Sequence, residues 1–144
     1  MSELTGIHVL LVDDDADARD ALLSVFECLG ARATAACSAA DARLVLRYVR
    51  PDVIVSDLCM PGETGFQFIA GIRAEEQARG GHVPAVAISA YFSASDREAA
   101  FRAGFEAFLM KPFEIDELAA VVSTVVRPHA VRLAEPLRVA RSHA

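Results

Sequence analysis

The sequence contains no tryptophan, only one lysine, and no apolar run long enough to cross a membrane. A membrane-spanning helix needs about 20 consecutive apolar residues, so we expect neither such a helix nor a membrane partner. The N-terminal segment also lacks the basic stretch and the cleavage site of a secretory signal peptide. We therefore expect a cytoplasmic protein.

Cysteine and histidine are scarce and scattered. The three cysteines, Cys28, Cys37 and Cys59, are odd in number and show none of the spacings of a metal site. We expect them to be reduced and buried as small hydrophobic side chains. None of the four histidines belongs to a nucleophile motif with serine or cysteine. The sequence therefore gives little support for a zinc site or a catalytic triad.

Positive charge is in the minority, with 14 basic and 20 acidic residues and a formal net charge of −6. This balance argues against a nucleic-acid-binding surface on the body of the protein. Residues 127–144 differ, because they hold four arginines and one glutamate. From the length of 144 residues and the 53% hydrophobic content we expect one domain over 1–127. Residues 128–144 would form a basic linker or tail, either disordered or partly helical.

Apolar residues alternate between strand-like and helix-like spacing along the chain. Short apolar runs predict five strands, at Ile7–Val12, Arg32–Cys37, Val53–Ser56, Ala85–Ser89 and Ala107–Met110. The second of these is the weakest and is expected near an edge. A helix is predicted after each strand: the second begins at a Ser38 cap and ends before Pro51, and the fourth spans Asp96–Ala103. Strands that are apolar on both faces indicate an α/β fold, with a single parallel sheet covered by helices on both faces.

Ligands of a parallel α/β sheet bind at the carboxyl ends of its strands. The polar residues placed there are Asp13, Asp14 and Asp15 after the first strand, Asp57 after the third, Ser89 after the fourth and Lys111 after the fifth. Two carboxylates about 4 Å apart repel each other by ~1 kcal/mol in water and by more near protein. Such a cluster favours a bound cation, and oxygen ligands beside a phosphate suit Mg²⁺. The alternative is that the acidic run only caps the helix that follows, a role open to Asp15 or Asp17.

Lys111 is the only lysine beside thirteen arginines. A compact ammonium group at the end of a strand suits a small anion such as a phosphoryl group. Pro112 follows it, and we expect the bond between them to be a candidate for the cis form. The hydroxyl of Ser89 can donate to a phosphoryl oxygen. Together these groups predict phosphoryl transfer with Asp57 as the nucleophile.

These motifs make the sequence resemble the receiver domain of bacterial two-component response regulators, over about residues 5–127. The matching segments, in order, are LLVDDD, SDLCMPGETG with its D-x-x-M-P-x-x-x-G form, ISA and KP. The resemblance implies a flavodoxin-like fold. It also implies that the protein is a signalling domain rather than an enzyme, apart from its own phosphotransfer and slow autodephosphorylation.

Roles follow from the resemblance residue by residue. Asp57 would accept a phosphoryl group from a sensor histidine kinase or a histidine phosphotransfer protein. The implied Mg²⁺ ligands are Asp13, Asp14, Asp57 and the backbone carbonyl of Cys59. Lys111 would neutralise the phosphoryl oxygens, and Ser89 would move to bond one of them. Gly65 would permit the turn into the third helix.

The resemblance also implies a switch made of Ser89 and Phe108, which occupies the position of the family's aromatic switch residue. Phosphorylation would then alter the surface of the fourth helix, the fifth strand and the fifth helix, where a downstream protein or a second subunit would bind. Cys59 and Tyr91 are expected to tune the lifetime of the phosphoryl group.

Two alternatives remain open at this stage. The first is a receiver fold that acts as an interaction module without phosphorylation. The second is a phosphohydrolase of the haloacid dehalogenase type, with Asp13 as nucleophile and Asp15 as acid and base. Against the second, no acidic pair follows Lys111 on a later strand, and the M-P-x-x-x-G segment after Asp57 would have no role.

Overall fold

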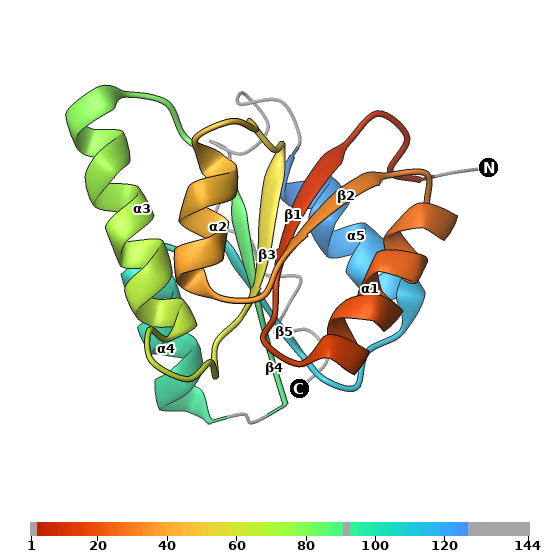
Figure 1. The fold of residues 1–144 in the computed structure, drawn as a ribbon. Helices are drawn as coiled ribbons and strands as arrows, with labels where there is room; N and C mark the ends of the chain where they lie inside the picture. Colours follow the sequence, from red (N-terminus) through yellow and green to blue (C-terminus); the bar gives the residue numbers. More distant parts are fainter. Residues whose placement is uncertain (1–2, 91–92, 127–144) are drawn as a thin grey trace.

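A computed structural model describes residues 3–90 and 93–126 of the chain. The elements are β1 (His8–Val12), α1 (Ala16–Cys28), β2 (Arg32–Ala36), α2 (Ala39–Leu46), β3 (Val53–Asp57), α3 (Gly65–Arg79), β4 (Ala85–Ser89), α4 (Ala94–Ala103), β5 (Ala107–Met110) and α5 (Ile115–Val125). Their strict alternation confirms the predicted order (Figure 1). The predicted tail over 128–144 and the predicted role of Tyr91 lie outside the described residues.

The strands form one parallel sheet in the order β2-β1-β3-β4-β5. β2 lies at an edge, as its weak apolar pattern predicts. The order reverses between β1 and β3, which is where α/β sheets open a crevice for ligands. The register pairs Val12 of β1 with Ser56 of β3, so the residues that follow, Asp13 and Asp57, lie beside each other at the carboxyl edge.

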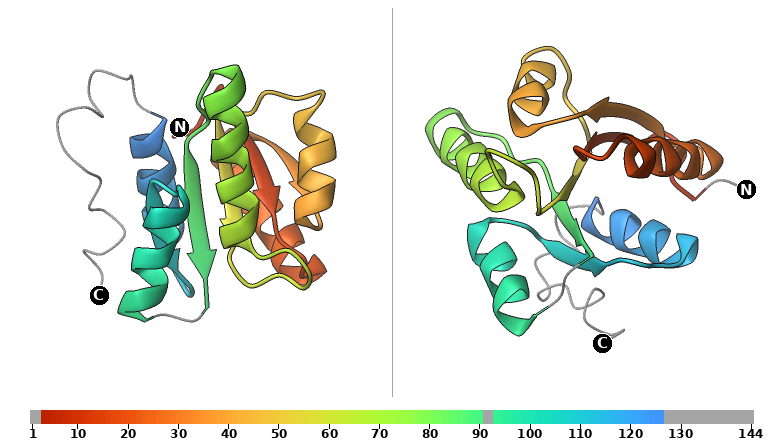
Figure 2. Two further views of the ribbon diagram at one scale, coloured as in Figure 1. Left: turned by 90° about the vertical axis from the view of Figure 1, so that its left-hand side faces the viewer. Right: turned by 60° about the horizontal axis from the view of Figure 1, so that its bottom comes forward.

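Helices cover both faces of the sheet, with α1 and α5 on one side and α2, α3 and α4 on the other (Figures 1 and 2). Successive strand residues point to opposite faces. Val9 and Leu11 therefore belong to the core under α1 and α5, whereas Leu10 and Val12 belong to the core under the other three helices. This double burial explains why the strands are apolar throughout, and it confirms the predicted fold class.

Two helix boundaries differ from the prediction. α2 ends at Leu46, well before Pro51, because the N–H groups of Arg47 and Tyr48 bond to carbonyls three residues back, at 3.1 and 3.0 Å. This tighter spacing ends an α-helix. α4 begins two residues earlier than predicted, because Ser93 caps it by accepting the N–H of Asp96 at 3.1 Å.

The expected burial of the cysteines is wrong. Cys28, Cys37 and Cys59 are all free and all exposed. Cys28 ends α1 away from the buried side chains of that helix, Leu22 and Phe26, and the other two follow β2 and β3 in loops. Within the described ranges, no helix is both long enough and apolar enough to span a membrane.

Candidate functional site

The loop after β1 fixes the first acidic residue firmly. Asp13 is fully buried, and its backbone N–H donates to the carbonyl of Ala36 at 3.1 Å. One carboxylate oxygen, Oδ1, accepts the N–H of Asp15 at 3.0 Å. Asp15 itself caps α1 by accepting the N–H of Asp17 at 3.1 Å. The capping role is therefore confirmed for Asp15, and it leaves Asp13 and Asp14 available for other chemistry.

Three carboxylates meet at the carboxyl edge of the sheet. Asp13, Asp14 and Asp57 each place an oxygen within 4.8 Å of the others, and Asp14 is the exposed member. Oδ2 of Asp13 is buried and has no hydrogen-bond donor within the described part of the chain. Buried polar atoms normally have a partner, and a hard cation would supply one. This all-oxygen cluster fits Mg²⁺.

Asp57 is held at the end of β3 with little access to solvent. Its side chain accepts the N–H of Cys59 at 3.4 Å, and its backbone carbonyl accepts the Ser56 hydroxyl at 2.9 Å. Burial raises the pKa of Asp57, the Lys111 ammonium group lowers it, and the Asp13 charge raises it. The charged form is therefore disfavoured by burial and by its acidic neighbour, and Lys111 offsets part of that cost.

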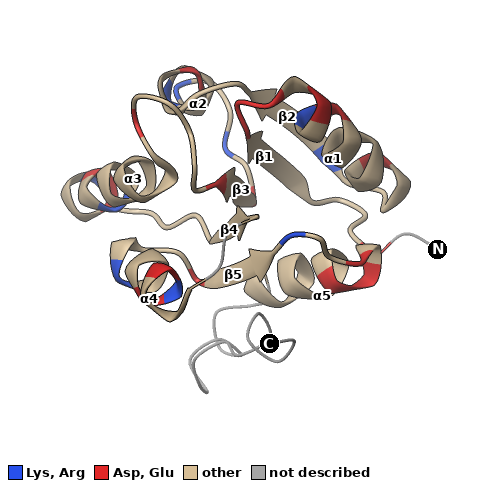
Figure 3. Cartoon of the chain, turned by 90° about the horizontal axis from the view of Figure 1, so that it is seen from below, with Lys and Arg blue, Asp and Glu red and all other residues tan. Residues whose placement is uncertain are grey.

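Lys111 reaches the acidic cluster from the other side. Its ammonium nitrogen, Nζ, lies 3.6 Å from Oδ2 of Asp13, and its backbone N–H donates to the carbonyl of Ser89 at 2.8 Å. The Lys111–Pro112 bond is cis, as predicted. Figure 3 looks onto this edge, with acidic residues at the ends of β1 and β3 and a basic residue after β5. The structure thus brings the predicted residues of four strands to one edge.

The two predicted switch residues are both buried. Ser89 is 2% exposed at the end of β4, and Phe108 is 1% exposed within the core under α2, α3 and α4. Phe108 sits beside Ala87 of β4 in the sheet register. The aromatic ring therefore lies inward in this structure.

Gly65 lies at the turn into α3, as expected, and the turn requires its lack of a side chain rather than an unusual backbone conformation. Its backbone conformation is open to other residues, since its φ is not positive. A Cβ atom at this position would lie 2.3 Å from the carbonyl oxygen of Asp57 and 2.8 Å from the Cα of Leu58. Glycine is thus required because the first turn of α3 touches the backbone of the acidic strand end.

Two contacts near the site were not predicted from the sequence. Arg19 of α1 donates from Nη1 to the backbone carbonyl of Asp13 at 2.8 Å. Arg43 of α2 forms an ion pair with Glu63 in the loop after β3. A signal for the first was present, because Arg19 is the only lysine or arginine among the first 31 residues.

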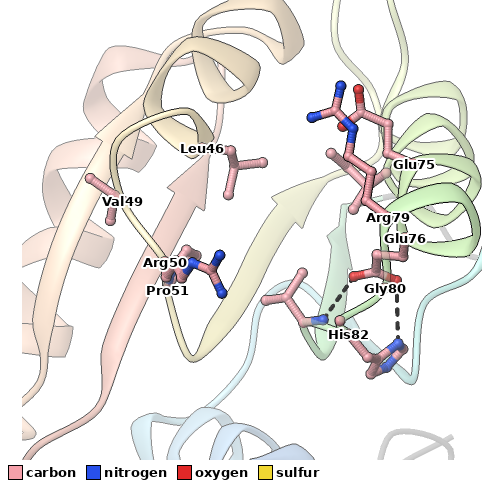
Figure 4. A pocket seen from close by; sticks show the side chains of 12 residues that line it. Leu46, Val49, Arg50, Pro51, Glu75, Glu76, Arg79, Gly80 and His82 are labelled. Atoms are coloured by element: carbon pink, nitrogen blue, oxygen red, sulfur yellow. Dashed lines mark hydrogen bonds and ion pairs between the residues drawn. The ribbon is translucent and has the colours of Figure 1, made fainter.

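The amino edge of the sheet carries a second polar cluster, which surrounds Arg73 of α3. The guanidinium group donates to Glu76 at 2.9 Å, to Glu106 at 2.9 Å and to the carbonyls of Val83 and Gly104 at 2.7 and 2.9 Å. An open groove of about 370 Å³ adjoins this cluster between the end of α2 and the end of α3. Figure 4 shows Glu76 at its wall, bonded to the N–H of Val83 and paired with His82.

Comparison with known proteins agrees with this geometry. Residues 9–123 match the family model described as the response regulator receiver domain. An uncharacterized 14.6 kDa protein of Leptolyngbya boryana is 40% identical over 122 residues, which cover 85% of this chain and 92% of that protein. Response regulator Rre1 of Synechocystis is 35% identical over 83% of this chain, which spans only 52% of Rre1.

The solved structures include the receiver domain of sensor histidine kinase PA1611 from Pseudomonas aeruginosa, crystallised with a magnesium ion in its active site cleft. It is 30% identical, with a TM-score of 0.75 over 85% of this chain and 98% of that one. Receiver domains are signalling domains rather than classical enzymes. The chain therefore belongs to the response regulator receiver domain family.

Proposed function

We propose that this protein accepts a phosphoryl group on Asp57 and acts as a phosphorelay receiver. The observation that carries the proposal is the cluster of Asp13, Asp14 and Asp57: their carboxylates lie within 4.8 Å of one another, and the buried Oδ2 of Asp13 has no hydrogen-bond partner among the described residues. The donor would be a sensor histidine kinase or a histidine phosphotransfer protein. Family membership supports this reading over the phosphohydrolase alternative.

In the proposed transfer, an oxygen of the Asp57 carboxylate attacks the phosphorus atom. The bond from phosphorus to the donor's histidine nitrogen breaks, the electron pair stays on that nitrogen, and the imidazole takes up a proton. The product is an aspartyl phosphate. Lys111 would face the phosphoryl oxygens and offset their charge, and the Ser89 hydroxyl would donate to one of them.

The residues present fit a Mg²⁺ ion. The carboxylates of Asp13, Asp14 and Asp57, with the backbone carbonyl of Cys59, would hold it. A bound Mg²⁺ ion supplies charge neutralisation for the transferring phosphoryl group. The related PA1611 receiver, which carries magnesium in its active site cleft, supports this assignment.

We further propose that the surface of α4, β5 and α5 binds a downstream protein or a second copy of this chain. Three large hydrophobic side chains are exposed there: Phe101 on α4, Met110 on β5 and Ile115 at the start of α5, at 37, 37 and 50%. Each of the three elements thus carries one exposed hydrophobic side chain that a partner could cover. Ser89 and Phe108 would couple the phosphoryl group to this surface, and hydrogen exchange that stays the same there on phosphorylation would contradict the coupling.

The domain limits and location complete the proposal. The receiver domain would end at residue 127, residues 128–144 would form a linker or tail, and the protein would be cytoplasmic. A fragment of residues 1–127 should then accept phosphoryl groups as fast as the full chain. If the fragment fails to fold, the C-terminal boundary of the domain would lie beyond residue 127.

The first experiment follows intact mass after incubation with acetyl phosphate or phosphoramidate, with and without Mg²⁺. We expect wild type to gain one phosphoryl group only with Mg²⁺, and Asp57→Asn to gain none. Asp20→Asn, which removes an exposed carboxylate of α1, is the matched control and should behave as wild type. Wild-type protein that gains no mass from either donor would favour the interaction-module alternative.

A further inference from the structure

Arg19 makes one contact that bears directly on the acidic cluster. Its Nη1 atom donates at 2.8 Å to the backbone carbonyl oxygen of Asp13. That oxygen belongs to the peptide group between Asp13 and Asp14, and a peptide group is planar. Holding the oxygen therefore also fixes the direction in which the chain leaves Asp13 and enters Asp14.

The stability of α1 does not explain a positive charge at this position. Arg19 lies in the first turns of the helix, where the dipole favours acidic side chains and disfavours basic ones. It is also the only lysine or arginine in the first 31 residues. The side chain is half-buried and turns back past the start of its own helix to reach Asp13.

The other restraints act mainly on Asp13, and one of them also holds the peptide group that follows Asp14. Asp13 is buried, its N–H is bonded to Ala36, and its Oδ1 is bonded to the N–H of Asp15. Asp14 is exposed, so burial does not orient it. Arg19 holds the peptide group before Asp14, and the Asp13 carboxylate holds the one after it through the N–H of Asp15. The contact with Arg19 thus fixes the entry of the chain into Asp14, which the other bond leaves open.

We propose that Arg19 is a positioning residue for the cation site. Its guanidinium group fixes the peptide between Asp13 and Asp14, so that both carboxylates face the same ion. The inference rests on the proposed Mg²⁺ site and adds a residue outside the ligand set. Groups that orient metal ligands in this way typically change metal affinity by about 10- to 100-fold when removed.

The direction in which the Mg²⁺ dissociation constant changes when Arg19 is removed distinguishes a positioning role from a purely electrostatic one. Arg19 is a cation, so if it acted only through its charge, its removal would relieve repulsion and tighten Mg²⁺ binding. If it acts by holding the peptide, its removal weakens binding despite the relief of repulsion. The two roles therefore predict opposite changes in the Mg²⁺ dissociation constant.

The test is calorimetric titration with Mg²⁺ alone, on wild type, Arg19→Ala and Arg19→Lys. We expect a dissociation constant about 10-fold higher for Arg19→Ala, and a smaller increase for Arg19→Lys, which keeps a donor and the charge. Arg32→Ala, which removes an exposed arginine at the start of β2, is the charge-matched control and should leave the constant unchanged.

Thermal unfolding without Mg²⁺ shows whether each variant is folded before its titration is interpreted. Binding by Arg19→Ala that equals or exceeds wild type would overturn the positioning role and leave the proposed function intact. Wild-type protein that binds no Mg²⁺ would overturn the proposed metal site and this inference with it. An equal loss in Arg32→Ala would show that the loss is not specific to the contact between Arg19 and Asp13, and would also overturn the positioning role.

Discussion

At the carboxyl edge of the sheet, Asp13 buries a carboxylate oxygen that has no hydrogen-bond donor in residues 3–90 and 93–126, whereas at the amino edge Glu76 and Glu106 have donors on both oxygens. Both clusters bring acidic and basic side chains of distant segments together. In the part of the chain that the structure describes, the carboxylates of the amino edge are fully hydrogen-bonded and that of Asp13 is not. The comparison suggests that the ion pairs at the amino edge stabilise the fold. At the carboxyl edge, a carboxylate oxygen is left without a hydrogen bond, which suits the binding of a cation and a phosphoryl group.

The largest effect on stability is expected from Arg73→Ala. The change leaves two carboxylates, each with side chains only 15 to 24% exposed, without their guanidinium partner. We expect the free energy of unfolding to fall by about 2–3 kcal/mol in urea denaturation. Arg79→Ala, an exposed arginine on the same helix, should change it by no more than about 0.5 kcal/mol. Equal losses in the two variants would contradict the role of the cluster.

Neutralising one carboxylate should have opposite signs at the two edges. Asp13→Asn removes the pair with Lys111 but also the repulsion of Asp57, which keeps Lys111 as its own partner, so the metal-free protein should gain about 1 kcal/mol of stability. Glu106→Gln weakens its bonds to Arg73 and His82, so stability should fall by about 1 kcal/mol. Urea denaturation in a metal chelator measures both. A loss in both variants would remove the distinction between the edges.

A smaller effect is expected from Asp57, in the pH dependence of the free energy of unfolding. Burial raises the pKa of Asp57 in the folded protein, so the folded state holds the proton more tightly than the unfolded state does. Asp57 therefore does not lower the free energy of unfolding at a pH below its unfolded pKa, and it lowers it by the full amount at a pH above its folded pKa. In a metal chelator, Asp57→Asn should therefore gain stability relative to wild type as the pH rises above about 4. A constant difference across pH would contradict this.

The smallest effect is expected for Glu63→Gln. A hydrogen bond from Arg43 lowers the pKa of Glu63, so its contribution is present above the unfolded pKa and is lost as the pH falls through the folded pKa. The two side chains are 31 and 40% exposed, and solvent screens the pair, so we expect a loss of about 0.5 kcal/mol or less. A double-mutant cycle with Arg43→Gln measures it, and a coupling above 1 kcal/mol would show that this pair is stronger than a surface pair.

Much of the carboxyl edge was predictable because it depends on strand ends. The apolar runs place Asp13, Asp57, Ser89 and Lys111 after their strands, and parallel strands end at the same edge. The amino edge was not predicted. Arg73 is bonded to Glu106, which lies 33 residues further along the chain. Nothing in the local sequence indicates which carboxylate an arginine will pair with at that separation.

The errors have similar causes. The cysteines were expected inside because free cysteine is often buried, but burial depends on which face of a helix or loop meets the core. Gly65 was placed correctly at the turn into α3, but the sequence did not reveal the close approach to the main chain of Asp57 and Leu58 that requires glycine there. Arg19 offered a signal in its isolation and in its place against the helix dipole, but its partner is a backbone atom, which carries no signature in sequence.

The contact at Gly65 also determines how the site responds to mutation. The smallest possible addition there, a single methyl group, would collide with the main chain that carries Asp57. The collision can be relieved only if α3 moves away from the sheet or if the end of β3 moves toward its neighbours. At position 65, the addition of one carbon atom would therefore shift the reacting carboxylate by moving its backbone, without any change of charge.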